Sequence, residues 1–238
     1  DPGQALECKE SFSMLANDKA SEAVLTADVF RHGQGGFHAN MASVSPACAT
    51  RLATLAEECG VNYLASPVLG RPHVAEAGKL NILVAGNEEA IFAAEPYFAH
   101  LGVRTWRLGP AHQLANLVKV AINYNIIHAI QAIAESMALV ERHGVEPQFF
   151  SELLSNTLFG GIVYSGYSEI IADGSYQPQL FSLELGKKDL DLAIQAAADK
   201  GLVFPVAEVF STLFDKALAN PDLRDADWAA LAEVTRQQ

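Results

Sequence analysis

The chain has 238 residues, and half of them are hydrophobic, which is enough for one large core or two smaller ones. A formal net charge of −12 repels a phosphate backbone, so we expect no nucleic-acid partner. Three cysteines without a CxxC pair argue against a disulfide framework and a zinc site, and they favour a reducing cytoplasm. We therefore expect no metal. Polar residues interrupt the longest apolar stretch, so we also expect no membrane association.

The first part of the chain alternates short apolar runs with segments of helical periodicity. We predict strands over residues 11–15, 37–41, 61–64, 80–85 and 103–108. We predict helices over residues 18–25, 46–59 and 88–101, with a loop over residues 66–71. Strands that alternate with helices predict a parallel α/β sheet of the Rossmann type.

After Gly109 the sequence shows helical patterns only. Helices are predicted over residues 110–143, 147–158, 182–200, 205–219 and 226–236. We therefore predict two domains, an α/β dinucleotide-binding domain over residues 1–109 and an all-helical substrate and dimerisation domain over residues 110–238. The long helix after Gly109 would join them.

Lys119 is the only formally charged residue between Leu108 and Ala134. His112, Asn116, Lys119 and Asn123 follow one another at spacings of four, three and four residues, so the four residues share one helix face. One interpretation is that Lys119 extends along a partly exposed stripe to reach solvent. The other is a catalytic lysine facing a cleft, where partial desolvation lowers the pKa of an ammonium toward neutrality and allows proton transfer to a substrate oxygen.

Four segments resemble motifs of the β-hydroxyacid dehydrogenases. Lys119 and Asn123 follow Gly109 as in the family pattern Gly-x(n)-Lys-x-x-x-Asn. Three other segments are similar to the family's DxSTxxP motif, its DAPVSGG…G.L substrate loop and its late KDL motif, at residues 40–46, at residues 65–71 with 78–80, and at residues 188–190. The family includes 3-hydroxyisobutyrate dehydrogenase, glyoxylate and succinic semialdehyde reductases and, more distantly, 6-phosphogluconate dehydrogenase.

The resemblance implies an oxidoreductase that moves hydride between NAD or NADP and a hydroxy acid or aldehyde, with Lys119 as general acid/base and Asn123 orienting the substrate. It further implies a homodimer built through the helical domain. It assigns substrate contacts to Leu69, Gly70 and Arg71, and cofactor contacts to Leu15, Ser43 and Lys188. Structural interpretations stay open for three of these residues: a turn before a helix for Ser43, a surface lysine for Lys188 and a turn glycine for Gly70.

The sequence departs from the family pattern at two places. The dinucleotide fingerprint G-x-G-x-x-G does not occur, and we expect the first βαβ unit of the Rossmann domain to lie upstream of Asp1. Leu69 and Arg71 stand where the family has Ser and Gly, which favours a substrate with an apolar group. An imine reductase-like enzyme and a non-catalytic dehydrogenase-like interaction module are the alternatives, and the choice between NAD and NADP stays open.

Overall fold

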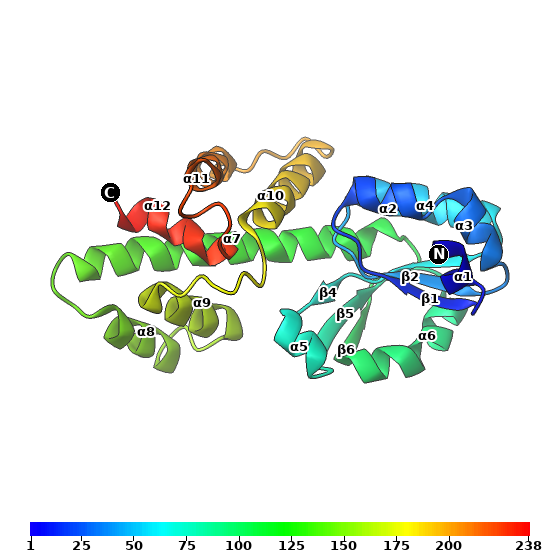
Figure 1. Cartoon of the computed structure of the whole chain (residues 1–238), viewed down its shortest axis with the longest axis horizontal. Helices are drawn as coiled ribbons and strands as arrows, with labels where there is room; N and C mark the ends of the chain where they lie inside the picture. Colours follow the sequence, from blue (N-terminus) through cyan, green and yellow to red (C-terminus); the bar gives the residue numbers. More distant parts are fainter. The chain divides into compact units, whose positions relative to one another are not determined.

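The computed structural model describes residues Asp1–Gln238 and divides into two compact units (Figure 1). Unit 1 comprises Asp1–Ala121 and unit 2 comprises Ile122–Gln238. The longest helix, α7 (Gln113–Glu141), is continuous through the division. The last strand ends at Arg107, close to the predicted domain boundary after Gly109, whereas the first turns of α7 belong to unit 1. The boundary of functional domains at residue 109 stays a prediction.

Unit 1 contains the predicted strands, in two short sheets. Three strands pair in parallel in the order β1-β2-β3, namely β1 (Glu10–Ser13), β2 (Phe37–Asn40) and β3 (Asn62–Ala65). The other three are β4 (Val68–Leu69), β5 (Leu80–Val84) and β6 (Gly102–Arg107). β6 is parallel to β5 but β4 is antiparallel, so the expectations of a wholly parallel sheet and of a loop over residues 66–71 are wrong at this strand. A two-residue strand is too short to show a periodic pattern.

Helices cover both faces of the strands in unit 1 (Figure 1). The helices are α1 (Pro2–Leu6), α2 (Asp18–Val24), α3 (Ala27–His32), α4 (Pro46–Glu58), α5 (Pro72–Glu76) and α6 (Glu88–Leu101). Side chains alternate along a strand, and Tyr63 and Ala65 accordingly pack in a core cluster with residues of α3 and α4. Leu64, between them, packs in a second cluster with residues of α6. The result is the three-layer α/β arrangement that the alternation of elements predicts.

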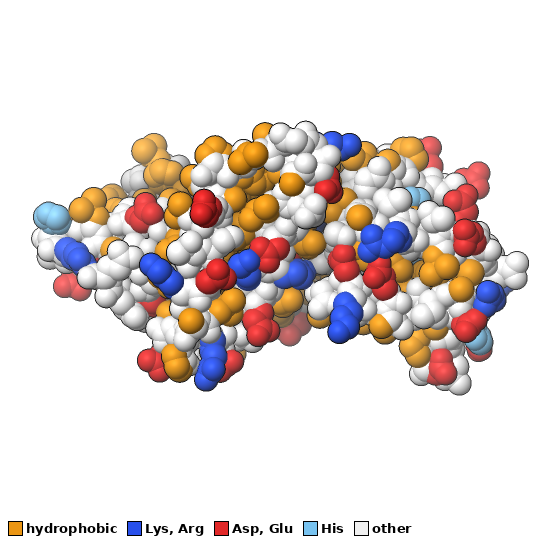
Figure 2. Space-filling view, turned by 90° about the horizontal axis from the view of Figure 1, so that it is seen from above, with side chains coloured by type: hydrophobic (Ala, Val, Ile, Leu, Met, Phe, Trp, Pro, Cys, Tyr) orange, Lys and Arg blue, Asp and Glu red, His pale blue; other side chains and the backbone are white.

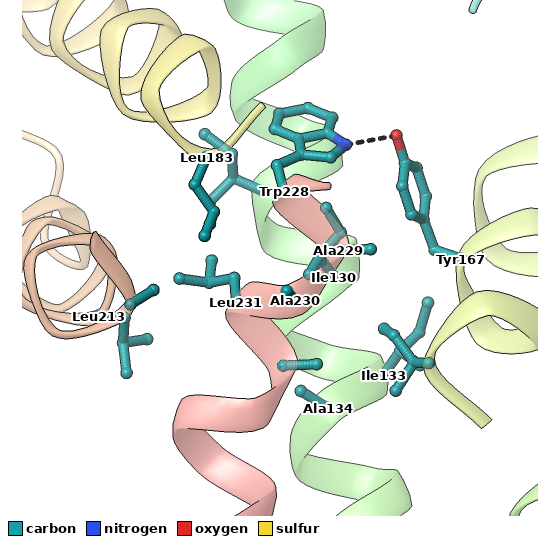
Figure 3. Packing of buried hydrophobic residues seen from close by; sticks show 14 of the residues in the cluster. Ile130, Ile133, Ala134, Tyr167, Leu183, Leu213, Trp228, Ala229, Ala230 and Leu231 are labelled. Carbon is teal, nitrogen blue, oxygen red and sulfur yellow. Dashed lines mark hydrogen bonds between the residues drawn. The ribbon is translucent and has the colours of Figure 1, made fainter. Parts of the chain in front are cut away.

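Unit 2 is all-helical. Besides α7 it contains α8 (Pro147–Asn156), α9 (Ile162–Asp173), α10 (Leu183–Ala198), α11 (Ala207–Ala219), the short 3-10 helix η1 (Trp228–Ala232) and α12 (Glu233–Arg236). Its core forms around the inward face of α7, where Ile127, Ile130 and Ile133 are fully buried. In Figure 3 the η1 segment lies against α7, and the Trp228 indole donates a hydrogen bond of 2.7 Å to the Tyr167 hydroxyl. The predicted α/β-then-helical fold is therefore confirmed.

By length and composition, α7 is apolar enough to cross a membrane, with a mean hydropathy of 1.3 in its most apolar window. The core helix of a soluble protein meets the same criterion, and 44% of that window is buried inside the chain. The buried isoleucines of α7 belong to the core of unit 2. The apolar character of α7 is thus explained by core packing.

Candidate active site

The carboxyl ends of three parallel strands meet at one edge of the first sheet, because Ser13, Asn40 and Ala65 are paired in register. Leu15 follows the end of β1 and Ser43 follows the end of β2, and both side chains are half-buried. Open α/β sheets bind their ligands outside the carboxyl ends of the strands. The topology of unit 1 therefore brings these two candidate cofactor contacts to the edge where a ligand is expected.

Hydrogen bonds hold the loop that carries Ser43. The Asn40 Oδ1 accepts from the Ala42 N–H at 3.0 Å, and the Asn40 Nδ2 donates to the Tyr63 hydroxyl at 3.0 Å. The Val44 N–H donates to Asn116 Oδ1, on the first turn of α7, at 3.3 Å. Ser43 therefore lies between two anchored backbone groups, and the start of α7 is fixed to the same edge of the sheet.

Asn116 is 1% exposed, and its Nδ2 has no hydrogen-bond partner within the chain. A buried amide donor without a partner is rare, and a bound group or an ordered water is what normally satisfies it. His112 lies just before α7, with its Nε2 at 3.0 Å from the Tyr63 carbonyl oxygen. The predicted polar face therefore starts at Asn116, because the helix begins at Gln113 rather than at residue 110.

Lys119 lies one helical turn after Asn116 and one turn before Asn123 on the continuous helix α7. Its side chain is half-buried, next to the buried Val120. Asn123 is 3% exposed. Ala115 and Val118 of the same helix pack in a core cluster of unit 1 that also includes Leu69. Within unit 1, the first turns of α7 and the predicted substrate loop thus belong to one packed region.

The substrate loop contains a glycine that the backbone requires. Gly70 has φ +150°, a conformation that other residues rarely adopt, and an added Cβ would lie 2.7 Å from Leu80 Cδ2 and 2.9 Å from Val74 Cγ1. Leu69 ends β4 and is half-buried, and Arg71 is the half-buried N-cap residue of α5. The loop therefore presents an exposed glycine backbone between an apolar side chain and a cation.

In unit 2, Asn123 is tied to a residue that sequence reasoning did not single out. The Asn123 Nδ2 donates to Asp189 Oδ2, and the Lys188 ammonium lies 3.0 Å from Asp189 Oδ1. Asp189 is fully buried. The KDL motif contains this carboxylate, but its contact with a residue 66 positions away is a property of the fold. Lys188 is accordingly bound to a buried partner and is not an ordinary surface lysine.

The residues of unit 1 fit one part of a dinucleotide. The Ser45 N–H donates to Asp18 at 2.8 Å and the Cys48 N–H donates to Ser45 Oγ at 2.9 Å, so side chains of the protein already cap the N-terminus of α4. The sequence has no G-x-G-x-x-G turn. The carboxyl edge with Leu15, Ser43 and the partnerless Asn116 donor is instead suited to the reacting end of a cofactor.

Residues 4–109 match the model described as the NAD binding domain of 6-phosphogluconate dehydrogenase, and residues 114–235 match that described as the NAD-binding domain of NADP-dependent 3-hydroxyisobutyrate dehydrogenase. The oxidoreductase YfjR of Bacillus subtilis is 35% identical over 94% of this chain and 79% of its own length. The 2-hydroxy-3-oxopropionate reductase of Escherichia coli is 28% identical over 76% of this chain and 61% of its length. Among solved structures, 3-hydroxyisobutyrate dehydrogenase from Salmonella typhimurium superposes with a TM-score of 0.88 at 21% identity, over 97% of this chain and 80% of that one.

The fold and the matched domains define a nicotinamide-dependent oxidoreductase with a Rossmann-type domain and a helical domain. The chain belongs to the β-hydroxyacid dehydrogenase family, as its motifs predict. It is an NAD(P)-dependent dehydrogenase or reductase that acts on CH–OH groups. Its cofactor is NAD or NADP.

Proposed function

We propose that the enzyme transfers hydride between the nicotinamide of NAD(P) and the carbonyl or hydroxyl carbon of a hydroxy acid or aldehyde-type substrate, with Lys119 as general acid/base. One observation carries the proposal, namely the polar face of Asn116, Lys119 and Asn123 on a helix whose first turn is bonded to the loop at the carboxyl edge of the sheet. The nicotinamide, when bound, supplies or accepts the hydride.

Lys119 would handle the proton. In reduction, the hydride reaches the carbonyl carbon, the C=O π electrons move to oxygen, and the Lys119 ammonium donates its proton to that oxygen. In oxidation, the neutral amine accepts the proton from the hydroxyl group as the hydride leaves. Asn123 would hold the same oxygen through its amide, which fixes the reacting carbon relative to the lysine.

The substrate loop indicates the substrate class. Leu69 has no donor for a carboxylate, so we propose an aldehyde, ketone or imine that bears an apolar group. The Gly70 N–H would contact the polar end of the substrate. Arg71 would bind any carboxylate, since a guanidinium can pair with it through two hydrogen bonds.

Two other functions compete with this proposal. Reductive aminase structures from Aspergillus terreus superpose with TM-scores of 0.58 and 0.59, below the 0.83 and 0.88 of two 3-hydroxyisobutyrate dehydrogenases. Imine reductases usually lack the lysine, which disfavours an imine reductase-like enzyme. A non-catalytic interaction module would need neither Lys119 nor Asn123.

Cytoplasmic localisation stays a prediction.

The Lys119→Ala variant tests the proposal. Loss of the acid/base group is expected to lower kcat at least 100-fold while NADPH binding, followed by nucleotide fluorescence, stays within a few-fold of the parent. Lys216→Ala, which removes an exposed lysine of α11, is the matched control and is expected to retain full activity. Activity of the Lys119 variant within a few-fold of the parent would exclude the catalytic assignment.

We also propose a homodimer through the helical domain. The α8–α9 hairpin of unit 2 exposes large apolar side chains, with Leu158 89% and Ile162 93% exposed, and hydrophobic side chains also lie on the surface of unit 2 in Figure 2. Apolar surface of this kind marks association sites. Sedimentation is expected to give a dimer that Ile162→Glu dissociates. Val103→Glu, at an exposed apolar position of unit 1, is the control. A stable monomer at micromolar concentration would contradict the proposal.

A further inference from the structure

Asp189 is the carboxylate of unit 2 that contacts two candidate site residues. Its side chain is 0% exposed, and it lies on α10 next to the fully buried Leu190. A buried charge is costly unless its oxygens are bonded, and removal of a partner leaves that cost uncompensated. One oxygen accepts from Asn123 and the other is paired with Lys188. The contacts of Asp189 are therefore concentrated on the residues that we assign to substrate and cofactor.

The chemistry of a carboxylate sets the direction of the bond to Asn123. An ionised carboxylate only accepts hydrogen bonds, so the amide nitrogen and not the amide oxygen must face Asp189. An amide turned by 180° would bring its oxygen against the carboxylate. Asp189 thus fixes which end of the Asn123 amide points toward it and leaves the Asn123 carbonyl oxygen directed away from the carboxylate.

The second oxygen restrains a flexible cation. The Lys188 side chain is 22% exposed, and its ammonium lies 3.0 Å from Asp189 Oδ1. Lysine loses much rotamer freedom when it is held in one geometry, and an ion pair formed in advance lowers that cost at the moment of ligand binding. The backbone that carries Asp189 is itself fixed by the buried Gly186 and Leu190 of the same helix.

We propose that Asp189 is a positioning residue, which holds the Asn123 amide in the one orientation that can orient the substrate and keeps the Lys188 ammonium in place for the cofactor. This inference rests on the proposed roles of Asn123 and Lys188. Asp189 touches neither substrate nor cofactor in it. Asp189 acts through the Asn123 amide, because it fixes the directions in which the amide oxygen and the remaining N–H face the substrate.

The test uses the intact enzyme with Asp189→Asn. An asparagine at this position offers a donor as well as an acceptor, so the Asn123 amide is free to turn. We expect KM for the substrate to rise at least tenfold, the apparent pKa of the pH–kcat profile to stay that of the parent, and the dissociation constant for NADPH to rise by a few-fold. Asp189→Ser removes the same constraint with less volume and serves if the first variant does not fold.

Two further variants separate positioning from a purely structural role. In an Asn123→Ala background, Asp189→Asn is expected to add less than twofold to KM, because the group through which it acts has gone. Asp227→Asn is the matched control, since Asp227 is a buried carboxylate of the same unit that accepts hydrogen bonds from backbone N–H groups. We expect this variant to have a lower Tm and a KM within threefold of the parent.

The outcomes distinguish the two proposals. The positioning role would be overturned if Asp189→Asn raised KM equally in the parent and in the Asn123→Ala background, or if both Asp189 variants had an unchanged KM. The proposed function would still stand in either case, provided that Asn123→Ala alone is impaired. Normal kinetics of Asn123→Ala would instead overturn the assignment of Asn123, and the positioning role with it.

Discussion

The two units satisfy their buried polar groups by different means. Unit 1 buries neutral groups, with His38 at the centre of a set of side chains on neighbouring strands. Unit 2 buries Asp189 and Asp227 and half-buries Arg236. Asp189 and Arg236 form ion pairs, and Asp227 accepts hydrogen bonds from backbone N–H groups. Neutral hydrogen bonds are insensitive to salt but fail when a member gains a charge, whereas ion pairs need both partners. The contrast predicts different sensitivities to pH and to substitution.

In unit 1, both ring nitrogens of His38 are bonded to serine hydroxyls, Nδ1 to Ser11 and Nε2 to Ser13, at 2.9 Å each. Burial lowers the pKa of His38 to about 4, so the ring stays neutral at physiological pH. A neutral imidazole has one donor and one acceptor, and a hydroxyl group can complement either. Burial likewise raises the pKa of the neighbouring Tyr63, and this phenol also stays neutral.

In unit 2, Arg236 joins the end of the chain to two other helices. Its guanidinium bonds to both oxygens of Glu141 on α7, to Glu233, and to the Ile171 carbonyl oxygen of α9 at 2.7 Å. The side chain is 14% exposed. Hydrogen bonds from Arg236 to Glu141 raise the pKa of the guanidinium further above its usual value. This network is one reason that the short α12 remains attached to the helical core.

The largest expected effect is an acid lability of unit 1. The pKa of His38 is 6.5 in the unfolded chain and about 4 in the folded one, so the unfolded state binds more protons between these values. Neutral His38 therefore makes its full contribution to the free energy of unfolding above pH 6.5. As the pH falls toward 4, this contribution decreases by about 3 kcal/mol. Urea unfolding followed across this range is expected to show the loss, with His38→Gln giving a flatter profile.

His143→Gln is the matched control for this prediction. His143 is exposed and its Nδ1 contacts only the Leu139 carbonyl oxygen of its own helical segment, so its replacement is expected to leave the pH profile unchanged. A profile that is equally steep in the parent and in His38→Gln would assign the acid lability to other groups and remove His38 from the comparison.

The next effect concerns the ion pairs. Arg236→Met is expected to lower the free energy of unfolding by about 2 kcal/mol, because it leaves the Glu141 and Glu233 carboxylates close together without their shared cation. This loss is smaller than that for a fully buried ion pair, since the Arg236 side chain is partly exposed. Arg51→Met breaks the Arg51–Glu22 pair of unit 1, whose side chains are 57% and 41% exposed, and is expected to cost less than about 1 kcal/mol. If chemical denaturation showed the same loss in free energy of unfolding for Arg236→Met and Arg51→Met, the two units would not differ in this respect.

Periodicity predicted most of the fold, and its failures have physical causes. The helix over residues 88–101 was predicted to the residue, since an Asn cap, an apolar face and Gly102 define it. Helix α9 (Ile162–Asp173) was missed because Gly161 and Gly166 weaken its pattern, and the three five- or six-residue helices are too short to show one. Of the site, the Lys119–Asn123 spacing was readable, whereas the contact between Asn123 and Asp189 depends on tertiary packing.

The smallest effect extends the comparison to the substrate. In unit 1 the proposed substrate loop carries an apolar side chain, Leu69, where the family has Ser. We expect Leu69→Ser to raise kcat/KM for 3-hydroxyisobutyrate or D-glycerate about tenfold in the intact enzyme, since a hydrogen bond to a charged group contributes about 1.5–3 kcal/mol. The gain is placed at the lower limit because the Gly70 N–H and Arg71 would already bind part of the carboxylate.

Leu69→Ala separates the hydroxyl group from the space that the substitution opens. Both variants remove the branched side chain, which packs against a core cluster of unit 1, and both are expected to lose activity toward substrates with an apolar group. Only the serine variant has a donor for a carboxylate, so only it is expected to gain activity toward the small acids. An equal gain in the alanine variant would show that pocket size determines specificity. If the parent enzyme already turns over those acids efficiently and Leu69→Ser changes nothing, Leu69 does not determine specificity.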